Sequence, residues 1–281
     1  QEVRKMNRSE ALYFKRWPDV PQAEFLAPEG YASVYRTNAF TKHGEHGNGW
    51  GHRVACTMRS TMTTLLNDSG ILRVATYNIH KGVQGIGPAR RLEIHNLGHA
   101  VEQLDADIVC LQEVRKMNRS EALYFKRWPK VPQAEFLAPE GYSSVYRTNA
   151  FTKHGEHGNA LLTRWPVIGH QHEDISDHRF EQRGLLHVQV DIQGKHVHVI
   201  VVHLGLIAGS RVRQVQRIRQ FIEREIPSHA PLIVAGDFND WGLQIKTALA
   251  RFGLIEFDAT QALTFPARLP LVQLDHIYVR G

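Results

Sequence analysis

The chain has 281 residues, of which 42% are hydrophobic and 22% charged, and its formal net charge is +6. This composition is typical of a folded globular protein and excludes the disordered and membrane-spanning classes, because no apolar run approaches the ~20 residues that cross a bilayer. Two cysteines exclude a disulfide framework, and Cys110, in an apolar run, is expected to be a buried thiol. No secretory signal follows Gln1, so we expect a cytoplasmic location.

Residues 1–48 repeat residues 112–159 with two differences. A single incomplete copy cannot stack into a solenoid, and it lacks the strands needed for a sheet of its own. We therefore expect residues 1–57 to be a duplicated fragment plus linker that forms no independent domain. The functional domain is then expected to span residues 58–281, beginning near Met58.

From residue 71 onward, apolar segments with strand periodicity alternate with segments of helical periodicity. The predicted strands are 71–78, 107–112, 186–192, 197–204, 231–236 and 273–279. The predicted helices are 90–104, a second that Ser210 caps and Pro227 ends, and 244–252. Four arginines of the second helix, Arg211, Arg213, Arg217 and Arg219, are expected on its solvated face. The pattern favours two packed sheets flanked by helices.

Polar side chains follow the ends of several predicted strands, where a rigid backbone meets loops that can admit substrate. They are Asn78, Glu113, His203, Asp237 and Asn239, with Asp275 just inside the last strand. Carboxylate and amide oxygens suit Mg²⁺ better than zinc. His154 and His157 have helical spacing, but neighbouring glycines favour a loop there, and no zinc site is expected.

These residue types also suit hydrolysis of a phosphate ester. Asp237 can accept a proton from water or orient it, Asn239 can donate to a phosphoryl oxygen, and His203 as imidazolium can stabilise the transition state. Each residue alone has a structural alternative: Asn78 as a turn former, Glu113 as a solvated carboxylate, and His203 as a core histidine. Their recurrence at successive strand ends favours a shared site.

Five motifs occur in this order: Thr-Tyr-Asn-Ile-His-Lys-Gly, Leu-Gln-Glu-Val, Gly-Asn-Ala-Leu-Leu, Val-His-Leu-Gly and Ala-Gly-Asp-Phe-Asn-Asp-Trp. Over residues 71–281 the chain resembles the endonuclease/exonuclease/phosphatase superfamily of DNase-like metal-dependent phosphoesterases, and within it a bacterial YbhP-like subgroup. The resemblance implies an α+β fold, a four-layer α/β/β/α sandwich of two mixed sheets, with the site at one rim.

The resemblance also implies roles for individual residues. Metal binding falls to Glu113, Asn78 and Asp275; catalysis to His203, Asp237 and Asn239; and phosphate binding to Asn159 and Arg183. The implied cofactor is Mg²⁺, with Mn²⁺ as an alternative. His80 stands where relatives sometimes carry an aspartate, so no second metal ligand is expected there.

The family pattern normally ends with a further Ser-Asp-His segment, and this chain is expected to lack it because Gly281 precedes it. The leading hypothesis is a magnesium-dependent hydrolase of phosphodiesters or phosphomonoesters, with nucleic acid or phospholipid as substrate classes and no obligate protein partner. The alternative is a catalytically impaired remnant that at most binds a phosphate ligand. A DNA-binding module is a third interpretation, without an aromatic and basic patch to support it.

Overall fold

The protein is described by a computed structural model that covers residues 3–4, 39–41, 44–47, 53–59, 71–85, 87–241, 244–256 and 273–281. Before residue 72 only the backbone of short strands is described, so the side chains of the predicted fragment, residues 1–57, lie outside the described residues. Three of these strands, β1 (Val3–Arg4), β2 (Ala39–Thr41) and β3 (Gly44–Gly47), form a small sheet of their own.

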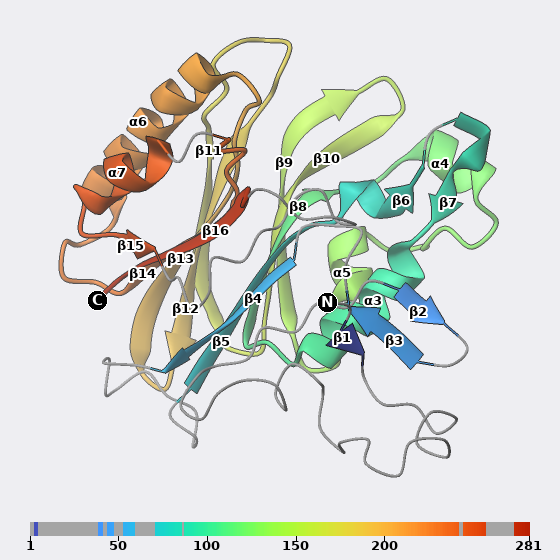
Figure 1. The fold of residues 1–281 in the computed structure, drawn as a ribbon, viewed down its shortest axis with the longest axis horizontal. Helices are drawn as coiled ribbons and strands as arrows, with labels where there is room; N and C mark the ends of the chain where they lie inside the picture. The colour runs from blue at the N-terminus through green and yellow to red at the C-terminus, as the bar shows by residue number, and fades with distance from the viewer. Residues whose placement is uncertain are drawn as a thin grey trace.

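Two larger sheets make up the body of the molecule (Figure 1). The five-stranded sheet has the order β4-β5-β8-β10-β9, and the six-stranded sheet has the order β11-β12-β13-β14-β16-β15. The strands of the first are β4 (Arg53–Arg59), β5 (Ile71–Asn78), β8 (Ile108–Val114), β9 (Ser143–Thr152) and β10 (Gly155–Thr163). Those of the second are β11 (Val167–Asp174), β12 (Gly184–Ile192), β13 (Lys195–His203), β14 (Leu232–Asp237), β15 (Ile255–Glu256) and β16 (Asp275–Arg280). Both sheets are mixed, because β5 is parallel to β8 and β13 is parallel to β14.

Helices cover the outer faces of the two sheets. Helices α3 (Ile94–Leu104) and α5 (Gln133–Leu137) pack on the five-stranded sheet, and α6 (Ala208–Glu225) and α7 (Gln244–Ala250) pack on the six-stranded sheet (Figure 1). Smaller elements are α4 (Arg119–Tyr124), two 3-10 turns, η1 (His80–Gly82) and η2 (Gly87–Ala89), and the hairpin of β6 (Val83–Gln84) and β7 (Arg91–Leu92). The expected four-layer sandwich is confirmed.

Strand alternation divides the core into layers. In β13, Val199 and Val201 pack between the two sheets, whereas Ile200 and Val202 pack against the helical layer of α6. This is the two-residue period of a strand buried on both faces. By the same alternation, the side chain of His203 lies between the two sheets. Because His203 is the last residue of β13, this polar side chain lies at the edge of the apolar core.

Most predicted elements are confirmed, with four corrections. The helix predicted over 90–104 begins only at Ile94, because Arg91 and Leu92 pair in strand β7. Helix α6 begins at Ala208 with Ile207 as N-cap, so Ser210 lies inside the helix, where its hydroxyl donates to Asp177 Oδ2 at 2.7 Å instead of capping. His157 lies within strand β10 and not in a loop. Arg211 is 6% exposed and belongs to the buried face of α6, and Arg217 is half-buried, whereas Arg213 and Arg219 are exposed as predicted.

Strand β4 was not expected from the sequence. It pairs antiparallel with the full length of β5, from Arg53 opposite Tyr77 to Arg59 opposite Ile71. Strand β4 is an edge strand of the five-stranded sheet. It includes residues before and after Met58, where the domain was predicted to begin.

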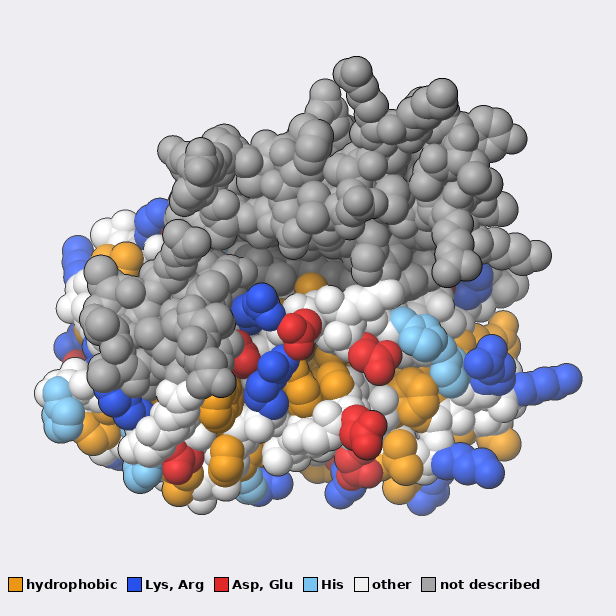
Figure 2. All heavy atoms as spheres, turned by 90° about the horizontal axis from the view of Figure 1, so that it is seen from below, with side chains coloured by type: hydrophobic (Ala, Val, Ile, Leu, Met, Phe, Trp, Pro, Cys, Tyr) orange, Lys and Arg blue, Asp and Glu red, His pale blue; other side chains and the backbone are white. Residues whose placement is uncertain are grey.

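Among the described residues, no helix combines the length and the apolar character needed to cross a bilayer. The described part of the face seen from below mixes basic, acidic, histidine and hydrophobic side chains (Figure 2). The positive charge visible on that part of the face is interspersed with negative charge.

Candidate active site

Three polar side chains form a row across the ends of neighbouring strands of the six-stranded sheet. His203 on β13 is the register partner of Asp237 on β14, and Asp237 is the register partner of Asp275 on β16. Paired residues project from the same face of a sheet. All three are buried, and His203 Nε2 lies 3.8 Å from Asp237 Oδ2.

Asn78, at the end of β5 in the opposite sheet, faces this row. Its amide nitrogen donates to Asp237 Oδ2 at 3.2 Å and to Glu113 Oε1 at 3.3 Å, and its Oδ1 accepts from the His80 backbone at 3.0 Å. A single buried amide therefore connects carboxylates carried by two different sheets. This contact brings three residues predicted from separate strand ends into one site.

A break in strand alternation directs Glu113 into the site. In β8, Cys110 packs between the sheets and Leu111 packs toward α3, so strict alternation would turn Glu113 outward. The backbone of Glu113 instead has φ 55°, and the pairing of β8 with β10 shifts register between Gly158 and Ala160. Bulges of this kind re-aim side chains next to functional sites, and a non-glycine residue at positive φ is strained.

Lys81 supplies a positive charge beside Glu113, since its Nζ lies 3.2 Å from Glu113 Oε2. Burial alone would raise the pKa of Glu113. The opposing charges of His203, Lys81 and His80 outweigh it and lower the pKa to about 2. Glu113 is therefore an ionised carboxylate at neutral pH.

The surroundings of His203 favour its neutral form, whereas those of Glu113 favour its charged form. Burial and the nearby Arg183 guanidinium lower its pKa to about 4, although Asp237 and Glu113 act in the other direction. The ring is neutral at pH 7 in the free protein. The imidazolium expected from the sequence is therefore not the resting form, because the site is too buried and too close to Arg183 to hold a second cation unaided.

The turn after β14 fixes Asp237. Gly236 is required here because a Cβ atom would lie 1.9 Å from the Val202 carbonyl oxygen. Asn239, at φ 48°, donates its backbone N–H to Asp237 Oδ1 at 3.0 Å and its side-chain amide to the Leu204 carbonyl at 2.9 Å. One carboxylate oxygen of Asp237 is thus held by the turn and the other faces Asn78 and His203.

Asn159 ties the two sheets together. Its side chain is fully buried, and its amide nitrogen donates to the carbonyls of Gly184 at 2.9 Å and Val201 at 3.1 Å. Both amide hydrogens are engaged, so a phosphate would have to displace one of these carbonyls. In the free protein Asn159 positions β12 and β13, and its predicted contact with phosphate stays a prediction.

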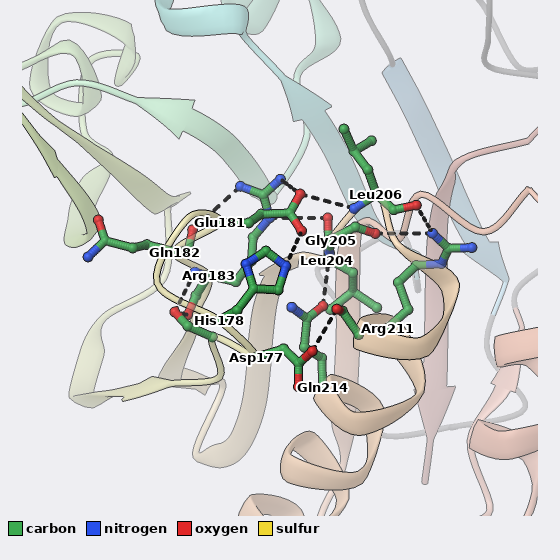
Figure 3. A network of polar contacts seen from close by, with 12 residues as sticks. Asp177, His178, Glu181, Gln182, Arg183, Leu204, Gly205, Leu206, Arg211 and Gln214 are labelled. Atoms are coloured by element: carbon green, nitrogen blue, oxygen red, sulfur yellow. Dashed lines mark hydrogen bonds and ion pairs between the residues drawn. The ribbon is translucent and has the colours of Figure 1, made fainter.

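Arg183 lies in the loop before β12 and is held by a network (Figure 3). Its Nε donates to the Leu204 carbonyl at 3.2 Å, and its NH2 group pairs with Glu181 Oε1 at 3.0 Å. The same Glu181 oxygen accepts from the Leu206 backbone at 3.0 Å. The network joins the loop before β12 to the loop after His203, and it holds the Arg183 charge close enough to act on the pKa of His203.

The donor set fits a hard divalent ion only in part. Glu113 offers an ionised carboxylate, and Mg²⁺ typically uses one or two carboxylates and keeps several waters. Among the described residues, no group of three His, Cys, Asp or Glu side chains is placed to enclose an ion. Asn78 turns its nitrogen toward Glu113 and Asp237, so it can offer oxygen to a metal only after its amide rotates.

Three ionisable residues of this region were not predicted as site residues from the sequence: Lys81, His157 and Glu181. Lys81 lies in the quoted Thr-Tyr-Asn-Ile-His-Lys-Gly segment, and its place directly after a strand end was the available signal. His157 has its pKa lowered to about 4 by burial and by Lys81, so it lies close to the same charges. Glu181 precedes Arg183 by two residues, and only the folded loop shows that they pair.

Comparison with known proteins identifies the family to which this fold belongs. The Endonuclease/Exonuclease/phosphatase family matches residues 75–281, and the chain belongs to that family. It is 38% identical over 217 residues to YbhP of Escherichia coli K12, with 74% of this chain and 85% of YbhP covered. The expected resemblance is confirmed.

Solved structures show the same fold at lower identity. An endonuclease/exonuclease/phosphatase from Beutenbergia cavernae superposes with a TM-score of 0.57 at 19% identity, covering 74% of this chain and 64% of that protein. This chain thus spans somewhat under two thirds of that relative. Sphingomyelinase C from Streptomyces griseocarneus superposes with a TM-score of 0.54 at 20% identity, covering 75% of this chain and 84% of the enzyme. Members of the family are phosphoesterases that generally depend on a divalent metal.

Proposed function

We propose that this protein hydrolyses phosphate esters with the aid of Mg²⁺, through attack of water on phosphorus. The observation that carries the proposal is the Asn78 amide, which joins Glu113 of one sheet to Asp237 of the other. Buried acidic groups brought together from separate elements at a strand rim are typical of a catalytic site rather than of a stabilising core.

The proposed metal ligands are Glu113, Asn78 after rotation of its amide, and Asp275. When bound, a divalent ion supplies positive charge that neutralises the phosphoryl oxygens and the leaving oxygen. Mn²⁺ has the same preference for oxygen and can replace Mg²⁺.

The remaining residues act on water and phosphate. Asp237 orients the attacking water and accepts its proton, because one of its oxygens is fixed by the Asn239 backbone and the other faces the site. Asn239 retains one amide hydrogen for a phosphoryl oxygen. Arg183 attracts the phosphate, and the negative charge of that phosphate raises the pKa of His203 toward the protonated form that stabilises the transition state.

The substrate is a phosphodiester or a phosphomonoester, and both nucleic acid and phospholipid satisfy this chemistry. The sphingomyelinase named above indicates that the fold accommodates a phospholipid substrate in that protein. Cys110 is a free, fully buried thiol, which suits the reducing cytoplasm where we place the protein.

The test is hydrolysis of bis-p-nitrophenyl phosphate and p-nitrophenyl phosphate by the full chain with Mg²⁺, before and after EDTA. We expect activity that EDTA abolishes and that falls about 10²–10⁴-fold in Asp237→Ala, the usual contribution of a positioned acid-base group. Glu140→Gln, at an exposed carboxylate outside the five motifs, is the matched control and should retain activity. Metal binding without turnover would instead identify the chain as a catalytically impaired remnant, which at most binds a phosphate ligand.

A further inference from the structure

A cavity of about 480 Å³ lies between helices α6 and α7 on the outside of the six-stranded sheet. Pockets that bind small molecules typically enclose about 300–1,000 Å³. The two helices lie side by side in this layer (Figure 1). The cavity is separate from the row of His203, Asp237 and Asp275, none of which lines it.

The walls of the cavity are largely apolar. Val212 and Val215 come from α6, Ile245 and Ala248 come from α7, and Phe252 follows α7. Val212 is 48% exposed although it lies one turn before the core residue Val215, so the cavity leaves an apolar side chain uncovered. Such a surface favours a hydrocarbon chain or ring.

The charge lining the cavity is mainly positive. Three arginines, Arg211, Arg219 and Arg251, line it together with a single carboxylate, Asp240. Asp240 Oδ2 already accepts the backbone N–H of Ile245 at 2.9 Å at the start of α7. Arg219 pairs with Glu223 at 2.8 Å and stacks over Phe252 at 4.7 Å, which leaves Arg211 and Arg251 as the cations without an ion-pair partner among the described residues.

Arg211 is the strongest indication of a ligand, because its side chain is only 6% exposed. Its NH1 group donates to the carbonyls of Gly205 at 3.2 Å and Leu206 at 2.6 Å, but in the described part of the chain no carboxylate lies within 4.0 Å of it. A buried cation is stabilised by a counter-charge, and carbonyl groups supply only partial charge. Figure 3 shows the second terminal nitrogen of Arg211 pointing away from the network that holds the Gly205 loop.

We propose that this cavity binds an amphiphilic organic anion, with its anionic head on Arg211 and its apolar chain or ring against Val212, Val215 and Phe252. The charge selects the head group, because the two arginines without an ion-pair partner among the described residues line the cavity, and its one carboxylate is already engaged. The apolar lining selects the rest of the molecule. The proposal does not depend on the reaction proposed above, since it concerns a second site and a binding measurement.

The test compares three probes of the same chain length and different charge: octanoate, octanamide and octylammonium. Binding to the full chain is measured by isothermal titration calorimetry below the concentration at which the probes form micelles. We expect octanoate to bind at least about tenfold more tightly than octanamide, since one charge-assisted hydrogen bond is equivalent to about a factor of ten or more. Octylammonium is expected not to bind.

Two variants test whether octanoate binds in this cavity. Arg251→Glu, at an exposed position, should weaken octanoate binding because it reverses one of the positive charges that line the cavity. Val212→Trp, on an exposed helical position, should abolish binding by filling the cavity while leaving the helix intact. Arg127→Glu, an equally exposed charge reversal outside the cavity, is the matched control and should leave binding unchanged.

Three results would overturn the proposal. Equal affinity for octanoate and octanamide would show that charge does not select the ligand. Unchanged octanoate binding in Val212→Trp, with the circular dichroism of the parent chain, would place the ligand elsewhere. Absence of octanoate binding to the parent chain would exclude a site for this class of anion.

Discussion

Asn78 holds the two halves of the candidate site together with one amide group. Its nitrogen donates to the half-buried Glu113 and the buried Asp237 at the same time, so it shields the two carboxylates from each other. Without such a donor, like charges at this separation repel strongly in a buried environment. The residue therefore has a stabilising role in the free protein in addition to any role toward a metal.

Asn78→Asp tests this role. The change replaces the shared donor by a third negative charge, so we expect the free energy of unfolding without metal to fall by about 2 kcal/mol or more. Added Mg²⁺ should restore stability and raise the melting temperature more in the variant than in the parent, because binding to the folded state stabilises it. Thermal denaturation with EDTA and with Mg²⁺ measures both effects.

Asn96→Asp is the control, since Asn96 is exposed on α3 and its change should alter neither the stability nor the response to Mg²⁺ by a comparable amount. An Asn78→Asp variant as stable as the parent in EDTA would contradict the assigned geometry.

The site residues could be predicted from sequence only where a polar residue ends an apolar strand. Asn78, Asp237 and His203 follow this pattern, and the structure brings them together. The position of Lys81 after a strand end indicated its place at the rim, but its pairing with Glu113 depends on a local break in strand alternation that no periodicity reveals. The neutral ring of His203 is likewise set by burial and by Arg183 from a distant loop.

At the scale of elements, the close approach of β14 to β13 determines where Asp237 lies. A Cβ atom on Gly236 would meet the Val202 carbonyl oxygen at 1.9 Å, whereas one on Gly169 in β11 would meet nothing within 4 Å. We expect Gly236→Ala to lower the free energy of unfolding by about 1–3 kcal/mol, the usual cost of overpacking. Gly169→Ala should change it little, and urea unfolding of the two variants provides the comparison. Equal stability of both would mean that the two strands can separate without cost.

A buried histidine pair connects the six-stranded sheet to α6. His187 Nε2 and His198 Nδ1 lie 2.9 Å apart, and the His187 ring packs edge-on against Phe221 of α6. Burial, followed by the repulsion of His198, lowers the pKa of His187 to about 4, against the attraction of Glu225. Burial also lowers the pKa of His198, assisted by Arg280 and His196.

The sign of the resulting pH dependence follows from proton uptake. Between the ordinary pKa of 6.5 and about 4, His187 binds a proton in the unfolded chain but not in the folded one, so stability falls as pH falls through this range. The loss from His187 approaches about 3 kcal/mol at the acid end. Urea unfolding at pH 7.5 and pH 5 should show this loss in the parent and a smaller one in His187→Gln. His229→Gln, at an exposed histidine, should behave as the parent, and an unchanged slope in His187→Gln would contradict the assignment.

The strands were easier to predict than their ends. Apolar β-branched residues mark β5, β13 and β14 within one or two residues of their observed bounds. The start of α6 was placed late because Ser210 is a favourable cap in isolation, but its hydroxyl bonds Asp177 from another loop instead. Tertiary contacts of this kind are absent from a local pattern.

At the scale of the whole molecule, the two sheets and four layers follow from the alternation of apolar segments. Strand β4 was missed although Val54, Cys56 and Met58 alternate in it, because the surrounding segment 49–70 is mostly small and polar and the pairing with β5 depends on an edge being available. The domain start near Met58 therefore stays a proposal that the position of β4 makes testable.

Two shortened chains test whether β4 belongs to the functional domain. A chain of residues 53–281 keeps β4 and should melt at the temperature of the full chain, whereas residues 60–281 expose the edge of β5 and should melt lower and aggregate more readily. Thermal melting with light scattering measures both properties. Equal melting of the two shortened chains would show that β4 contributes nothing to the domain.

Whether side chains from both sheets share one metal is decided most directly by anomalous X-ray diffraction from crystals of the full chain grown with Mn²⁺. We predict one strong anomalous peak at about 2.0–2.2 Å from a carboxylate oxygen of Glu113, the distance typical of small divalent ions, and within one bridging water of Asp237. A peak elsewhere, with neither Glu113 nor Asp237 beside it, or no peak at saturating Mn²⁺, would contradict the proposed site.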